Sequence, residues 1–189
     1  MKIVTLVENT SSDPKIAAEH GLSLYLETED QRILFDMGQT SAFAQNGEKL
    51  GVELSSVDFA VLSHGHYDHG GGLATFLRIN SHAPVYVHKT AFGAYYRGTE
   101  KYIGLDHCLQ SESRLFFTEG EAAITPKILL TDCNGRGWTN DPYGLNRREG
   151  DLFQPDDFRH EQYLQIREGE KKILISGCSH KGILNIAEY

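Results

Sequence analysis

The chain has 189 residues, of which 40% are hydrophobic and 23% are charged. This composition can bury one sizeable hydrophobic core, and it excludes disordered, collagen-like and repeat proteins. We therefore expect a single domain over residues 1–189. The formal net charge of −8 at pH 7 argues against a general nucleic-acid-binding protein, because phosphate affinity depends mainly on clustered Lys and Arg side chains.

Cysteine content and hydropathy limit the cellular setting. Only Cys108, Cys133 and Cys178 occur, which does not suit a disulfide framework and favours a reducing compartment. The apolar stretch in 1–8 is too short for a signal peptide, and no later segment approaches membrane-spanning length. We expect a cytoplasmic protein that acts on a small molecule, without a nucleic-acid or membrane partner, and we leave a homo-oligomer open.

The spacing of apolar residues predicts strands, where they alternate, and helices, where they recur every three to four residues, through most of the chain. The first half reads as strands at 2–8, 22–27, 32–35, 57–62 and 84–88, with helices at 41–50 and 73–79. The segment 90–154 is rich in Gly, Asn and Asp, and it shows one good strand candidate at 127–131. Its length suggests an irregular insertion that covers the substrate. Strands at 162–167 and 172–176 and a helix at 182–188 complete the expected elements.

A histidine-rich motif follows the apolar strand 57–62. It contains His64, His66, Asp68 and His69, and three glycines follow it at 70–72. Alternate side chains of an extended segment share a face, so His64 and His66 can bind one ion while the next turn directs Asp68 and His69 toward a second position. The alternative is a surface loop. The glycines lack the ending of a phosphate-binding P-loop, and we expect them to permit a tight exit into a helix.

This motif is similar to the H-x-H-x-D-H signature of the metallo-β-lactamase superfamily, which lies at the end of a core strand. The segment 31–38 resembles the superfamily's earlier D-x-G element, and the resemblance implies that Asp36 supports the metal loop without binding metal. The implied fold is α+β, an αββα metallo-β-lactamase-like sandwich. Superfamily members continue past this chain's last motif with further strands, a helix and a final histidine, so we expect a sandwich that is incomplete at the C-terminus.

Three further segments narrow the resemblance. Residues 19–23, 157–162 and 176–183 resemble the branch that contains the 7,8-dihydropterin-6-methyl-4-(β-D-ribofuranosyl)aminobenzene 5′-phosphate synthases. Many members of that branch are named only as metal-dependent hydrolases. In the branch, the synthases join an aminobenzoate to phosphoribosyl pyrophosphate, with loss of pyrophosphate and carbon dioxide. The resemblance therefore implies a fold more narrowly than it implies a substrate.

The resemblance also implies ligands from the second half of the chain. His160 matches the histidine that joins the first two, and the alternative is a surface histidine in a polar run. Cys178 occupies the place of a bridging carboxylate, or in some lactamases a cysteine, and His180 lies close enough to be the ligand in its stead. A thiolate beside cations is a competent ligand, but a buried structural thiol is the alternative for Cys178.

Two other side chains are candidates for substrate contacts. His20 lies at a predicted junction between a loop and a strand and matches a branch motif, with a solvated loop histidine as the alternative. Lys181 lies beside the predicted site and could meet a substrate phosphate, although such a lysine is more often solvated.

The expected chemistry is metal-dependent hydrolysis. Two divalent ions, Zn with Mn or Fe as alternatives, would make hydroxide available near neutral pH and stabilise developing negative charge, and Asp68 could orient the attacking water. The branch leaves a synthase activity open. A further alternative is a truncated or non-catalytic metal-binding domain that needs a partner, and it would expose an unpaired strand edge or an apolar patch.

Overall fold

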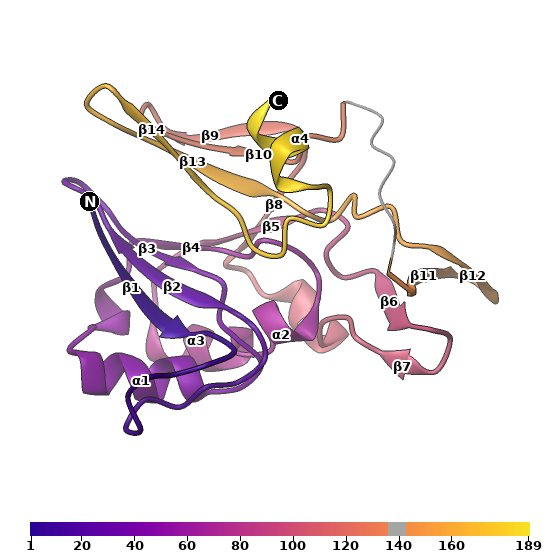
Figure 1. Ribbon diagram of the computed structural model, residues 1–189, viewed down its shortest axis with the longest axis horizontal. Helices are drawn as coiled ribbons and strands as arrows, with labels where there is room; N and C mark the ends of the chain where they lie inside the picture. Colours follow the sequence, from indigo (N-terminus) through magenta and orange to yellow (C-terminus); the bar gives the residue numbers. More distant parts are fainter. Residues whose placement is uncertain (136–142) are drawn as a thin grey trace.

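The computed structural model describes residues 1–135 and 143–189, and its largest element is a six-stranded mixed sheet (Figure 1). Its spatial order is β1 (Lys2–Val7), β2 (Ser23–Glu27), β3 (Arg32–Phe35), β4 (Phe59–Val61), β5 (Val85–His88) and β8 (Leu115–Thr118). The first three strands are antiparallel, and β3, β4, β5 and β8 run parallel. Because carboxyl ends of parallel strands meet at one edge, the loops after β3, β4 and β5 emerge side by side.

A second sheet packs against one face of the first. It is antiparallel, in the order β14 (Lys171–Ile175), β13 (Tyr163–Glu168), β10 (Ile128–Thr131) and β9 (Glu121–Thr125). The apolar core between the sheets includes Phe35 and Val61 from the first and Leu130 and Leu164 from the second. Alternation along each strand explains this arrangement, since Leu34 and Ala60 point to the opposite face and join a different cluster.

Helices cover the outer faces of both sheets (Figure 1). The helices α1 (Ala42–Leu50) and α3 (Leu73–Ile79) pack on the first sheet through Phe43 and Phe76. The short helix α4 (Ile183–Ala187) places Ile186 against Tyr163 of the second sheet. The order of layers is therefore helix, sheet, sheet, helix, and the predicted αββα sandwich is confirmed.

A third, smaller sheet lies at one end of the sandwich (Figure 1). Its order is β12 (Leu152–Pro155), β11 (Leu145–Glu149), β6 (Ala94–Arg97) and β7 (Lys101–Tyr102). The prediction of a largely irregular middle segment was wrong, because these strands and also β8 and β9 fall within it or reach its end. Cross-strand pairs such as Tyr95 with Arg147 join residues far apart in sequence, and short strands with few apolar residues leave little local pattern.

Outside that segment the predicted elements are confirmed within one or two residues. Helix α1 ends where Gly51 takes a left-handed conformation at φ 70°, which glycine adopts without steric cost. Three short turns complete the assignment: η1 (Leu54–Ser56), α2 (Tyr67–Gly70) and η2 (His107–Ser111). Within the residues that the structure describes, no helix has the length and apolar character needed to cross a bilayer.

Candidate metal centre

The metal loop is held by the buried carboxylate of Asp36, which lies directly after β3. Its Oδ1 accepts a hydrogen bond from the Ser63 backbone N–H at 2.7 Å, and its Oδ2 accepts from Ser63 Oγ and from His69 Nδ1, both at 2.6 Å. Asp36 has φ 59°, a conformation that Asp tolerates better than most residues. The structure thus places Asp36 beneath the loop as a support for His69.

These contacts fix the protonation of His64. The Ser63 hydroxyl has one proton, which it donates to Asp36, so Ser63 Oγ accepts at 2.9 Å from His64 Nδ1–H. His64 Nε2 then carries a lone pair, and it is buried without a hydrogen-bond partner. Burial and the neighbouring histidines hold the pKa of His64 well below its usual value. A neutral imidazole with an orphaned, buried lone pair is what a metal ligand requires.

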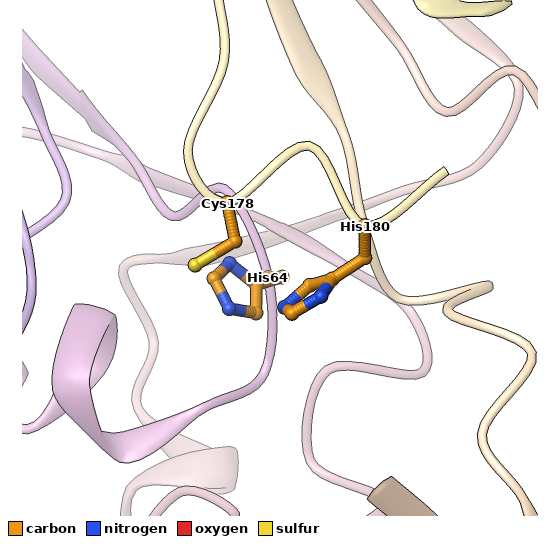
Figure 2. Close-up of side chains that lie close together, drawn as sticks. All are labelled: His64, Cys178 and His180. Carbon is orange, nitrogen blue, oxygen red and sulfur yellow. The ribbon is translucent and has the colours of Figure 1, made fainter. Parts of the chain in front are cut away.

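Residues from the far end of the chain meet this loop. Cys178 and His180 follow β14, and their side chains lie on either side of the His64 ring (Figure 2). One ligand atom from each of the three residues lies within 4.8 Å of the other two. His180 stacks on Phe158 with ring centroids 4.3 Å apart and planes 4° apart, and burial lowers the pKa of His180 to about 3. The structure therefore brings both alternatives expected from the sequence, Cys178 and His180, next to His64.

Asp68 and His69 form a second group with Cys178. Their ligand atoms also lie within 4.8 Å of one another, and Cys178 Sγ is 3.2 Å from His69 Nε2. Burial opposes a charged His69, but the Asp36 carboxylate outweighs it and raises the pKa of His69 well above its usual value. Cys178 is thus common to two groups that can hold an ion.

His20 lies at the rim of this second group. Its Nε2 is 3.4 Å from Asp68 Oδ2 and its side chain is 71% exposed, while its Nδ1 contacts Asn9 Oδ1 at 3.0 Å. The backbone at Gly21 approaches the Asp68 backbone so closely that a Cβ on residue 21 would stand 1.9 Å from the Asp68 carbonyl oxygen. Only glycine fits at this position. The structure therefore brings His20 to the site, as the sequence suggested.

His160 lies on the other side of the loop with His66. Together with Asp156 they form a third, fully buried group whose ligand atoms lie within 4.8 Å. Asp156 Oδ2 is 3.1 Å from His160 Nε2 and 3.7 Å from His66 Nε2. Burial lowers the pKa of His160 to about 4. The surface alternative for His160 is thereby excluded, since its exposed fraction is 0%.

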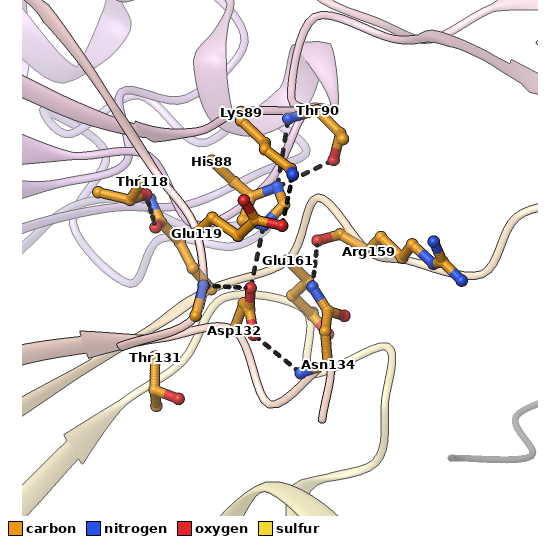
Figure 3. Close-up of polar contacts among 12 residues, drawn as sticks. His88, Lys89, Thr90, Thr118, Glu119, Thr131, Asp132, Asn134, Arg159 and Glu161 are labelled. Atoms are coloured by element: carbon orange, nitrogen blue, oxygen red, sulfur yellow. Dashed lines mark hydrogen bonds and ion pairs between the residues drawn. The ribbon is translucent and has the colours of Figure 1, made fainter. Parts of the chain in front are cut away.

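Lys181 does not face the site, which corrects the expectation of a substrate contact. It is 3% exposed, and its ammonium donates to the Asp132 carbonyl oxygen at 2.6 Å and to Asn134 Oδ1 at 2.7 Å. Figure 3 shows the polar cluster around Asp132, whose carboxylate contacts His88 Nε2 at 3.1 Å. The buried ammonium ties the turn after β14 to the loop after β10 through these acceptors, so its role is structural.

Two buried acids escaped the sequence reasoning. Glu161 Oε1 accepts from the His180 backbone N–H at 2.8 Å and Oε2 from that of Lys181 at 3.1 Å, so it holds the turn that carries His180. Asp156 joins His66 and His160. The only sequence signal for Asp156 is its position four residues before His160 in a polar run, and such runs are usually solvated.

The donors fit divalent cations. Imidazole nitrogens, carboxylate oxygens and one thiol converge from loops in both halves of the chain. The Nε2 of His64 is buried without a hydrogen-bond partner, as a metal-binding nitrogen would be before the ion is bound. Mixed N, O and S ligands suit Zn, and the N and O subset also suits Mn or Fe.

Comparison with known families agrees with this geometry. The family model described as "Metallo-beta-lactamase superfamily" matches residues 17–181. The chain belongs to this superfamily. The uncharacterized protein MJ0448 of Methanocaldococcus jannaschii is 35% identical to this chain. The alignment covers 99% of this chain and 73% of MJ0448.

Another relative from the same organism is described as 7,8-dihydropterin-6-methyl-4-(beta-D-ribofuranosyl)-aminobenzene-5'-phosphate synthase. It is 28% identical to this chain, and the alignment covers 100% of this chain and 71% of the relative. Among solved structures, Tm1679, described as a metal-dependent hydrolase of the beta-lactamase superfamily, matches with a TM-score of 0.80 and 32% identity, covering 98% of this chain and 69% of that one. The resemblance to this branch is thereby confirmed.

Proposed function

We propose that this superfamily member is a metal-dependent hydrolase that uses two divalent ions to act on a small, polar substrate. The observation that carries the proposal is the convergence of three ligand groups around one loop. They combine His64, His66, Asp68 and His69 of the motif with ligands from the turn after β14 and from the loop before β13. The similarity to Tm1679 supports hydrolysis as the class of reaction.

A bound divalent ion would supply Lewis acidity and lower the pKa of a coordinated water toward neutrality. The chain's own residues contribute position and proton transfer. Asp68 Oδ2 lies beside both His69 and the exposed His20, so Asp68 can orient a water and accept its proton. His20 lies at the exposed rim of the centre. Its Nδ1–H donates to Asn9 Oδ1, so its Nε2 carries a lone pair that can accept a proton during the reaction.

A second candidate is synthase chemistry of the kind named for the relative from Methanocaldococcus jannaschii. The observation that favours it is an alignment that spans the whole of this chain. The same centre would then polarise a phosphorylated substrate and stabilise a leaving group. The three ligand groups are compatible with either activity.

The test is an activity screen of the purified chain loaded with Zn, Mn or Fe. Phosphoesters, thioesters and lactones form one panel, and an aminobenzoate with phosphoribosyl pyrophosphate forms the other. We expect turnover in the first panel that a chelator abolishes and that His64→Ala lowers by at least about 1,000-fold. His82→Ala is the matched control, since His82 lies in an exposed bend outside the loop and belongs to none of the three ligand groups. Turnover only in the second panel would replace hydrolysis with synthesis, and equal turnover by His64→Ala would refute both.

A further inference from the structure

The carboxylate of Asp156 is a buried acid beside the metal loop that no motif explains. Its residue is 4% exposed, and it stands between two imidazoles. Its Oδ1 already accepts a hydrogen bond from the Phe158 backbone N–H at 2.9 Å. The other carboxylate oxygen, Oδ2, is the one that lies near His66 Nε2 and His160 Nε2.

The two distances from Asp156 Oδ2 have different meanings. The 3.1 Å separation from His160 Nε2 is a hydrogen-bond length. The 3.7 Å separation from His66 Nε2 is too long for a hydrogen bond, and His66 Nε2 has no hydrogen-bond partner although it is buried. Two ligands of one ion, each bonded at about 2.0–2.2 Å, lie about 3.3–3.8 Å apart for angles between tetrahedral and trigonal. The His66 pair has the spacing of two ligands.

The second nitrogen of His160 supports this division of roles. His160 Nδ1 accepts a hydrogen bond from the Gly65 backbone N–H at 2.9 Å. A neutral imidazole that accepts at Nδ1 carries its proton on Nε2, and it donates that proton to Asp156. A metal-bound histidine instead donates its second ring N–H to an acceptor. The Gly65 contact therefore makes His160 a hydrogen-bond donor in the arrangement that the structure shows.

We propose that Asp156 Oδ2 and His66 Nε2 bind the same divalent cation, and that His160 orients the Asp156 carboxylate by a hydrogen bond. Asp156 is then a metal ligand, and His160 is a positioning residue. The inference deepens the proposed function and rests on it, because it assigns one of the ions to particular atoms. Nitrogen and oxygen ligands in a buried site suit Zn, Mn or Fe.

The test is a competition titration of the purified chain with Zn and a chromophoric chelator, which measures affinity without any substrate. Asp156→Asn keeps the size of the side chain and an acceptor for the Phe158 N–H. We expect it to weaken the tighter of the two sites by at least about 100-fold. His160→Gln retains a donor toward Asp156, so its loss should stay below about 10-fold. Asp157→Asn is the matched control, because Asp157 pairs with the surface side chain of Arg159, and it should bind as the wild type does.

The outcomes separate the inference from the proposed function. If the wild-type chain binds no ion, the proposed function fails as well. If the wild type binds and Asp156→Asn stays within about threefold of it, the ligand assignment is overturned and the function stands. A larger loss in His160→Gln than in Asp156→Asn would also overturn it, since the histidine would then be the ligand.

A spectroscopic variant covers the case in which Asp156→Asn fails to fold. Asp156→Cys in a Cys178→Ser background, loaded with Co²⁺, should show thiolate-to-cobalt charge-transfer absorption, because a cysteine at the ligand position would contact the ion directly. The Cys178→Ser chain alone is the reference and should lack the band. Folding of each chain is checked by circular dichroism, and a folded Asp156→Cys chain that binds Co²⁺ without the band contradicts the proposal.

Discussion

Asp36 Oδ2 accepts a hydrogen bond from His69 Nδ1 at 2.6 Å, across 33 positions of sequence. The parallel pairing of β3 with β4 produces this contact, because the residues that follow the two strands emerge at the same edge of the sheet. The contact leaves His69 Nε2 facing Cys178 Sγ. A carboxylate that holds the far side of a metal-binding imidazole fixes both its orientation and its basicity.

Substitution of Asp36 tests this support. In Asp36→Asn an amide NH₂ replaces one carboxylate oxygen. Ser63 and His69 both donate hydrogen bonds to the carboxylate, so at least one of these buried hydrogen bonds is lost. We expect the free energy of unfolding to fall by about 1.5–3 kcal/mol and metal affinity to fall by about 10–100-fold. Urea denaturation and chelator competition measure the two effects. Asp30→Asn is the control, since Asp30 is exposed and pairs with the surface residue Lys127. An Asp36→Asn chain with wild-type metal affinity would show that Asp36 has no such role.

Gly65 is the second point where the loop depends on its neighbours. A Cβ at this position would stand 2.1 Å from the Ala91 carbonyl oxygen, so Gly65→Ala forces the backbone between His64 and His66 to move. We expect the chain to fold with reduced stability and to lose the tighter metal site. Gly47→Ala is the control, because its Cβ would meet the Leu54 side chain at 3.5 Å and the Val52 carbonyl oxygen at 3.7 Å, which are ordinary van der Waals distances, and alanine favours a helix. Equal metal content in both variants, measured by elemental analysis, would refute the prediction.

Lys181 should affect stability and leave substrate binding unchanged. Lys181→Met removes a buried cation from the carbonyl oxygen of Asp132 and from Asn134, and we expect a loss of about 2–4 kcal/mol in the free energy of unfolding. Lys127→Met, at an exposed position, should change that free energy by less than about 0.5 kcal/mol. In the folded fraction of Lys181→Met, KM for any substrate found should match the wild type. A rise in KM at unchanged stability would instead place the ammonium against the substrate.

The three thiols should react at different rates. Burial raises the pKa of Cys133 to about 11, so roughly one thiol in a thousand is ionised at pH 8 and alkylation is slow. Cys108 and Cys178 are exposed and should be labelled before Cys133. Because the folded pKa of Cys133 lies above that of a free thiol, its reactivity should grow steeply as the pH rises toward 11. Mass spectrometry of iodoacetamide-treated protein follows each cysteine, and labelling of Cys133 as fast as Cys108 at pH 8 would contradict the assignment.

The parts of the site that were predictable from sequence are local. The residues from His64 to His69 lie within one loop, and their type and spacing carry the metal signal without any tertiary information. The strand before them and helix α1 likewise follow from periodicity, because their apolar residues repeat at the intervals that one buried face requires. The resemblance added His160, Cys178 and His180, which spacing alone would not select.

The parts that were missed depend on long-range contacts. Asp156 meets His66 only in the folded chain, and nothing nearby in the sequence distinguishes it from the exposed Asp157. Lys181 was misread for the same reason, since its acceptor Asp132 lies 49 positions away. The third sheet was missed because its pairs, such as Tyr95 with Arg147, also join distant segments.

Metal stoichiometry of the purified chain tests the central claim most directly. The chain is loaded with Zn, and separately with Mn or Fe, freed of loose ions and assayed by elemental analysis beside His64→Ala. Because two of the three ligand groups share Cys178, we expect close to two ions per chain for the wild type and a clear loss for His64→Ala. One ion or none in the wild type, or equal content in the two chains, would contradict a dinuclear centre built on His64.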